Sequence, residues 1–180
     1  AEAGPVTFED LAGGPGGISQ CGLVISSAGD SCYAAGEIQP GIEITASNGA
    51  GDLTVYVEAG NFGLPNDTVG SNGFLDYTIL NFPNNDVNSF AFDLYGLIGG
   101  STMDIRIFGT GGLITTETVT DSGAGVFFGY IAAETIVSVE IEDLSGGTAE
   151  LVAQISFGEC SGGGGGGGCA EENPNDFTFE

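Results

Sequence analysis

The chain has 180 residues, of which one is basic, none is histidine and 25 are acidic, so its formal net charge at pH 7 is −24. We exclude nucleic acid as a partner because neutralising phosphates takes several lysines or arginines. Catalysis through an imidazole or a lysine amine is excluded because the chain contains neither group. Hydrophobic residues make up 41% of the chain, which is enough for the core of one domain.

The N-terminal part combines a β-prone segment with a glycine-rich region. The first three residues, Ala-Glu-Ala, are expected to be a mature end left after removal of a signal peptide. Residues 6–10 (Val-Thr-Phe-Glu-Asp) place acids beside an aromatic residue in an extended pattern. Residues 9–40 are rich in glycine and contain Cys21 and Cys32, which predicts a loop region stapled by a disulfide bond.

Alternation of apolar and polar side chains dominates the rest of the chain. Four segments alternate clearly and predict strands with one buried face: residues 53–58, 89–94, 103–108 and 137–142. Further strands are expected near residues 41–46, 74–82, 113–120, 126–131 and 149–157, and any short helix within residues 126–135. Many short strands separated by glycine and asparagine turns predict an all-β fold, a two-sheet antiparallel β-sandwich of jelly-roll type, in a single domain of residues 1–180.

The C-terminal part holds a polyglycine segment between two cysteines, Cys160 and Cys169, followed by a predicted strand at residues 175–180. Four cysteines allow three pairings, and we predict the local one, Cys21 with Cys32 and Cys160 with Cys169, because each bond closes a short loop. The polyglycine loop is interpreted either as an exposed loop or as a surface against which another backbone packs. Persistent disulfides predict export, and therefore an extracellular or cell-surface location.

The two ends of the chain are similar to each other, with Phe-Glu-Asp-Leu from residue 8 and Asn-Asp-Phe-Thr-Phe from residue 175. With these motifs the chain resembles secreted bacterial β-sandwich proteins that have a carbohydrate-binding-module-like jelly roll, many of which carry a PEP-CTERM-type sorting tail. In that group the first and last strands lie side by side, and acids at their ends often hold structural calcium. The resemblance therefore implies Glu9, Asp10 and Asp176 as calcium ligands. The alternative is that these are ordinary exposed acids.

These features predict a non-catalytic, secreted structural protein. Two carboxylates could in principle cleave a glycoside, but no such pair stands out, so an enzyme is not expected. Strand addition between copies, through Val6 and Phe8 at one end or Phe177 and Phe179 at the other, would build a homopolymeric filament. One alternative is a monomer whose ends pair within their own sheet. The other is a calcium-stabilised carbohydrate-binding module or adhesin-like domain with a glycan as its partner.

Four smaller observations complete the prediction. Asn66 begins an Asn-Asp-Thr glycosylation sequon. Arg106 is expected to pair with Asp104 or with an acid on a neighbouring strand, in a structural role. The acids within residues 140–143 are interpreted as the solvent face of their strand. No apolar run approaches the ~20 residues of a membrane span, so membrane insertion is not expected.

Overall fold

The computed structural model describes residues 7–47, 53–98 and 100–160, and all structural statements below concern these residues. They form strands and one short 3-10 turn, η1, at Asn61–Gly63. None of their helices is long and apolar enough to cross a membrane. The strands are β1 (Thr7–Glu9), β2 (Ile18–Gly22), β3 (Val24–Ser26), β4 (Glu43–Ala46), β5 (Thr54–Val57), β6 (Thr68–Ser71), β7 (Thr78–Asn81), β8 (Val87–Gly96), β9 (Thr102–Gly109), β10 (Gly112–Thr120), β11 (Val126–Asp143) and β12 (Glu150–Gly158).

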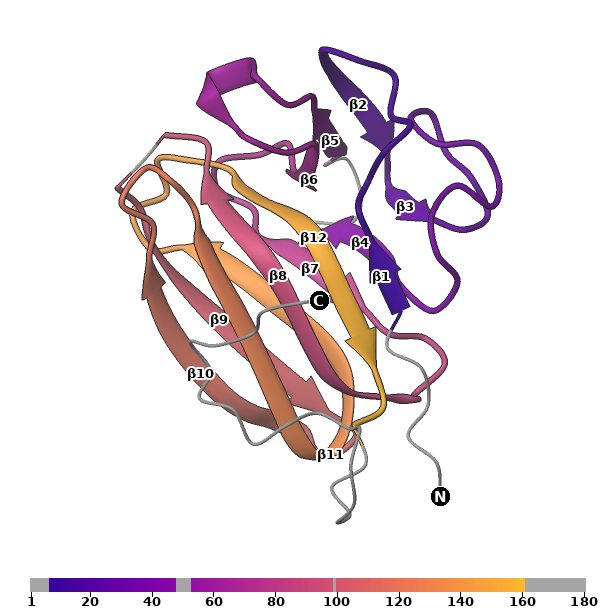
Figure 1. The fold of residues 1–180 in the computed structure, drawn as a ribbon. Helices are drawn as coiled ribbons and strands as arrows, with labels where there is room; N and C mark the ends of the chain where they lie inside the picture. Colours follow the sequence, from indigo (N-terminus) through magenta and orange to yellow (C-terminus); the bar gives the residue numbers. More distant parts are fainter. Residues whose placement is uncertain (1–6, 48–52, 99, 161–180) are drawn as a thin grey trace.

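Hydrogen bonding joins all of these strands into one open, antiparallel sheet (Figure 1). Its main path runs β2-β5-β6-β12-β8-β11-β7-β4-β3, with β1 attached to β12 and the β9-β10 hairpin attached to β11. The long strand β11 joins the two halves, since Val126–Ile131 pairs with β8 whereas Ser138–Ile141 lies between β7 and β9. The all-β prediction is confirmed. The predicted division into two sheets of a jelly-roll sandwich is not, because the strand ladders form a single sheet.

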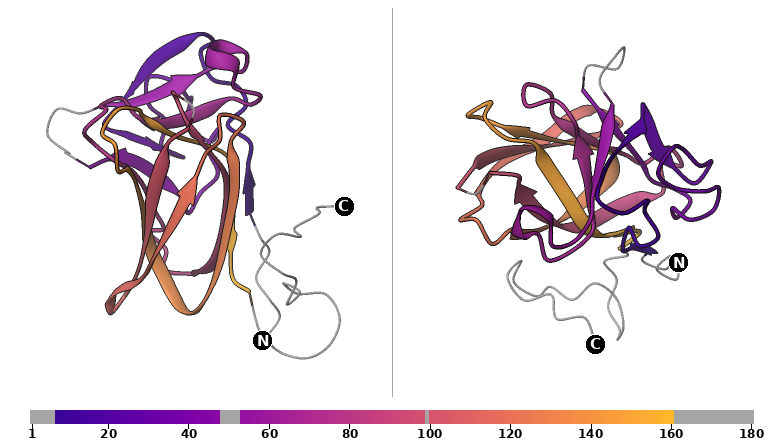
Figure 2. Two further views of the ribbon diagram at one scale, coloured as in Figure 1. Left: turned by 90° about the vertical axis from the view of Figure 1, so that its left-hand side faces the viewer. Right: turned by 90° about the horizontal axis from the view of Figure 1, so that it is seen from above.

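The sheet bends over on itself at β11, so that its two halves face each other (Figure 2). A register shift between Ile131 and Ile136 marks the bend, and Ile136 is fully buried there. The helix expected within residues 126–135 is wrong. This half of β11 alternates with period two, with Phe128 and Tyr130 packed against the core while Phe127 and Ile131 are exposed.

The main core lies between the two halves of the bent sheet. In β9, the predicted inward residues Met103, Ile105 and Ile107 are all 0% exposed, as the alternation requires. In β5 both faces are buried, with Tyr56 in the main core and Val57 in a second, smaller cluster. The second face is covered because other segments pack over β5, which its own alternation cannot reveal.

Residues 9–40, expected to be a loop region, contain the short strands β2 and β3 as well as loops. β2 pairs with β5, and β3 pairs with β4, so both extend the sheet at the same side of the molecule. The strands are three to five residues long, which is too short for alternation to signal them. They end the main path of the sheet, on the side of the molecule opposite β9 and β10 (Figures 1 and 2).

Candidate functional site

Strand β10 is an open edge of the sheet. One of its sides pairs with β9 from Gly112↔Gly109 to Thr120↔Thr102, and no described strand pairs with the other side. Most of its side chains are exposed, including Leu113, which is 56% exposed. A free row of backbone N–H and C=O groups is a template for another strand.

The composition of β10 gives this edge little protection. Natural proteins commonly block a free edge with charges, proline or bulges. β10 contains no proline, one charged residue, Glu117, and one register shift, between Leu113 and Thr115. Six of its nine residues are β-branched: Ile114, Thr115, Thr116, Thr118, Val119 and Thr120. In a chain with 25 acids, a nine-residue edge carrying one of them is therefore suited to strand pairing.

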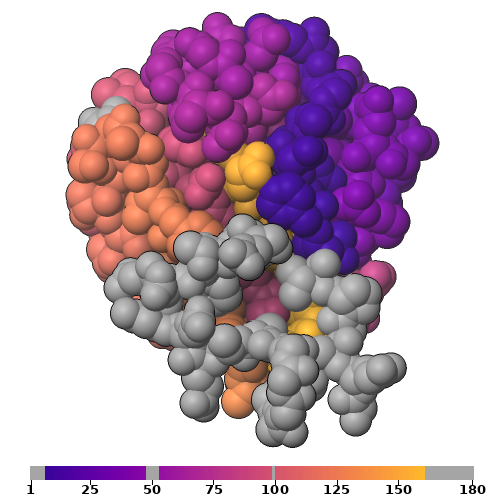
Figure 3. Space-filling view, in the orientation of Figure 1, coloured from indigo at the N-terminus to yellow at the C-terminus, as the bar shows by residue number. Residues whose placement is uncertain are grey.

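The N-terminal assembly segment is paired inside its own chain. Residues 7–9 of β1 lie antiparallel to Phe157, Ser156 and Ile155 of β12. Figure 3 shows this N-terminal segment, in indigo, next to the yellow surface of β12. Phe8 is 48% exposed, on the outside of the sheet. Val6, Phe177 and Phe179, the other predicted assembly residues, lie outside the described residues.

The predicted calcium ligands have separate partners in the structure. Glu9 is 3% exposed, and its two carboxylate oxygens accept the backbone N–H groups of Leu11 and Gln39, each at 2.8 Å. Asp10 is exposed and accepts the N–H of Ala12 at 3.0 Å. Asp176 lies outside the described residues. Glu9 therefore ties the end of β1 to the neighbouring loop, and a calcium ion at this position stays a prediction.

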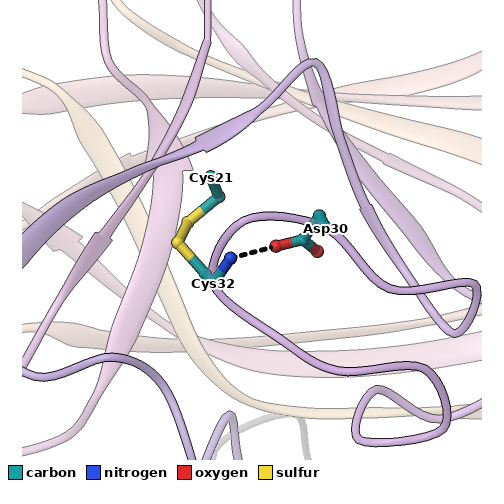
Figure 4. A group of neighbouring side chains, drawn as sticks. All are labelled: Cys21, Asp30 and Cys32. Atoms are coloured by element: carbon teal, nitrogen blue, oxygen red, sulfur yellow. Dashed lines mark hydrogen bonds between the residues drawn. A yellow bond between two sulfur atoms is a disulfide. The ribbon is translucent and has the colours of Figure 1, made fainter.

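The disulfide between Cys21 and Cys32 is confirmed. Asp30 lies beside it, and one of its carboxylate oxygens accepts the N–H of Cys32 at 2.6 Å (Figure 4). The same oxygen accepts the N–H of Tyr33 at 3.1 Å. The two sulfurs and the carboxylate lie close enough to resemble a metal site. Because the sulfurs are bonded to each other, they offer no thiolate to a metal. Cys160 is buried, and its predicted partner Cys169 lies outside the described residues.

The sequon and the arginine both have structural partners. The side-chain amide of Asn66 donates a hydrogen bond to the Tyr95 hydroxyl at 3.1 Å. Arg106 pairs with Glu140 at 3.2 Å and with Glu142, both on the neighbouring strand β11, and lies 4.9 Å from the centre of the Tyr77 ring. The expected structural pairing of Arg106 with an acid on a neighbouring strand is confirmed.

Exposed aromatic side chains gather at one small apolar cleft of about 120 Å³. Phe62 and Phe74 line it together with Ile18, and they are 62% and 49% exposed respectively. Ser71 and Asn72 are the polar residues in its lining. None of the five tyrosines, all of them within the described residues, is exposed. The tyrosines therefore do not form an exposed cluster within the described residues.

Among the buried acids that the sequence prediction missed, two lie next to each other in the hairpin of β11 and β12. Asp143, interpreted as part of a solvent face, is 5% exposed, and Glu150, at the start of β12, is 1% exposed. The parity of β11 could have revealed the first, because Asp143 shares its face with the buried Val139 and Ile141. Glu150 carries no such signal, since β12 is buried on both faces.

No family model matches the chain, and no curated protein matches it either.

Proposed function

We propose that this chain is a non-catalytic structural protein of the extracellular space or cell surface, and that copies assemble into filaments through their strand edges. The open edge of β10 is the observation that carries this proposal. Edge pairing uses backbone groups, so it needs neither the basic residues nor the imidazole that the chain lacks. In the same proposal the bent sheet corresponds to a two-layer sandwich of jelly-roll type.

The position of the edges favours an open chain of subunits. β10 lies on one side of the molecule, and the terminal strands β2 and β3 lie on the other (Figures 1 and 2). A contact between two different surfaces repeats without closing unless its rotation forms a ring. The strand donated to β10 comes from the next copy. The N-terminal donor would first have to leave β12, and the other predicted donor, Phe177 to Glu180, lies outside the described residues.

Net charge sets the conditions for assembly. Subunits with a charge of −24 repel one another at low salt, and this repulsion falls as salt screens it or as protons and divalent cations neutralise carboxylates. Filaments are therefore expected to form more readily at higher ionic strength, at mildly acidic pH and in the presence of calcium.

The test is negative-stain electron microscopy and sedimentation of the purified chain and of a double variant, Leu113→Glu with Thr120→Glu. Both positions are exposed on β10, and new acids there would face the acidic neighbour, so association should weaken roughly tenfold or more. A double variant with the same added charge, Gln39→Glu with Asn84→Glu, changes exposed residues away from β10 and should assemble like the parent chain.

Two results would contradict the proposal. The first is a chain that stays monomeric at high protein concentration under all of these conditions. The second is equal assembly of the β10 variant and its control. Selective retention of a glycan by such a monomer would favour the alternative, a carbohydrate-binding module, and the cleft beside Phe62 and Phe74 would then be the surface to change.

A further inference from the structure

The hairpin between β11 and β12 places two acids next to each other in the protein interior. Asp143 ends β11 and Glu150 begins β12. The backbone N–H of Asp143 donates a hydrogen bond to Oε1 of Glu150 at 2.6 Å, which brings the two residues together across the hairpin. Both are almost completely buried, at 5% and 1% exposed.

Each of these carboxylates has one oxygen with partners and one without. Oδ2 of Asp143 accepts the Ser145 hydroxyl and the N–H of Gly147, the latter at 3.0 Å. Oδ1 of Asp143 and Oε2 of Glu150 are buried and have no hydrogen-bond partner within the described part of the chain. Only one other side-chain oxygen there, on Asp30, shares this condition. Leaving a buried polar atom without a partner is costly, and for a charged group more so.

No basic side chain compensates this pair. The single arginine of the chain, Arg106, is engaged with Glu140 and Glu142, and there is no lysine or histidine. Burial, together with the negative charges of Asp143 and Glu142, raises the pKa of Glu150 to about 7. Burial also acts to raise the pKa of Asp143, but the Ser145 hydroxyl and backbone N–H groups outweigh it and lower that pKa overall. The two carboxyl groups therefore have no cationic side chain to compensate them.

The turn beside the pair supplies further oxygen atoms and borders a surface cleft, which neither acid itself lines. A surface cleft of about 530 Å³ lies against the turn and is lined by Ser145, Gly147 and Thr148 from the hairpin and by Ser101 and Thr102 from the start of β9. Calcium accepts six to eight oxygen ligands in flexible geometry, whereas magnesium requires a near-ideal octahedron and keeps most of its water. Carboxylate, hydroxyl and backbone oxygens at a turn are irregularly arranged, and this arrangement suits calcium better than magnesium.

We propose that the β11–β12 hairpin binds a calcium ion, with Oδ1 of Asp143 and Oε2 of Glu150 as its protein ligands. Hydroxyl or backbone oxygens of the turn and water molecules complete the coordination. This site is distinct from the one implied at Glu9, Asp10 and Asp176. It does not depend on filament assembly, because it lies within one chain.

The experiment measures calcium binding to the monomeric full chain at pH 7.5 by isothermal titration calorimetry and by thermal unfolding, after removal of metal with EDTA. Calcium at a hundred times its dissociation constant should raise the midpoint of unfolding by roughly 5–10 °C. Glu150→Gln should weaken binding at least tenfold and reduce this rise to about half or less. Asp86→Asn, which removes an equal charge from an exposed position, should leave both unchanged.

The variants also separate loss of the site from loss of the fold. Glu150→Gln keeps an oxygen that can accept the N–H of Asp143, and circular dichroism verifies that it is folded. Asp143→Asn tests the second ligand, and should it fail to fold, Glu150→Gln carries the test alone. The proposal is overturned if the parent chain shows no calorimetric signal at about 10 mM calcium, a concentration roughly tenfold above the weakest dissociation constants of extracellular calcium sites. It is equally overturned if folded Glu150→Gln binds calcium as the parent does.

Discussion

Replacing Glu150 by glutamine should make the calcium-free protein more stable at neutral and alkaline pH. The carboxyl group of Glu150 is 1% exposed, and its pKa is raised from 4.5 to about 7 by burial and by the charges of Asp143 and Glu142. Each step of one in pKa corresponds to about 1.4 kcal/mol, so the ionised form costs about 3 kcal/mol in the folded state. The glutamine amide removes this cost but must itself be buried, which leaves an expected gain of about 1–3 kcal/mol at pH 8.

The sign of the pH dependence follows from the direction of the shift. Between pH 4.5 and about 7 the folded chain keeps a proton on Glu150 that the unfolded chain has released. The contribution of this group to stability is therefore fully present below pH 4.5 and is lost as the pH rises through 7. With EDTA present, the difference in stability between Glu150→Gln and the parent should grow across this range and then level off.

Urea unfolding at pH 4.5, 6 and 8, monitored by tyrosine fluorescence, measures this difference directly. Taking the difference in unfolding free energy between two chains that differ at one residue cancels most of the general repulsion among the other carboxylates. The variant Asp86→Asn measures the effect that remains from losing one exposed charge. A difference between Glu150→Gln and the parent that does not change with pH would refute the reasoning, because it would mean that Glu150 titrates alike in both states.

Two further predictions concern single contacts. Opening the disulfide with Cys21→Ser and Cys32→Ser should cost about 3 kcal/mol, because the bond closes a short loop across a sequence separation of 11, and equal urea midpoints for this variant and the parent would contradict it. Gly70→Ala should destabilise the sheet by about 2 kcal/mol or more in a thermal melt, since its new Cβ would lie 2.0 Å from the backbone oxygen of Glu150; Gly111→Ala, with open space around it, is the matched control and should change little.

The sequence predicted best those strands that have one face in the core and one in water. In β9 the alternation of Met103, Ile105 and Ile107 with polar residues gave the correct inward face, because the outer face of this strand does meet solvent. In β5 the same rule fails for Tyr56, because alternation with Val55 and Val57 places it on the solvent face, whereas it is buried. Its ring packs edge-on against Tyr33, 6.1 Å between centroids, and Tyr33 comes from the glycine-rich region of residues 9–40. Alternation within one strand predicts which side chains share a face, but it does not predict which other segments of the chain cover that face.

The candidate sites depended on contacts that are distant in sequence. The free edge of β10 follows from which strands are neighbours, and strand order was not predicted. The buried pair of Asp143 and Glu150 needed a prediction of the β11–β12 hairpin, since β12 by itself gives no periodic signal. By contrast, the bond between Cys21 and Cys32 was predictable because closing a short loop costs little entropy.

The ion pairs of Arg106 bear on how this protein withstands digestion. A protease that cleaves only after lysine or arginine has one target in the whole sequence, and that target lies in the middle of β9, between β10 and β11. Its side chain is held by two glutamates and by the face of Tyr77. Trypsin can cut after Arg106 only once the sheet around β9 has opened. The rate of tryptic cleavage therefore measures how often this part of the molecule opens.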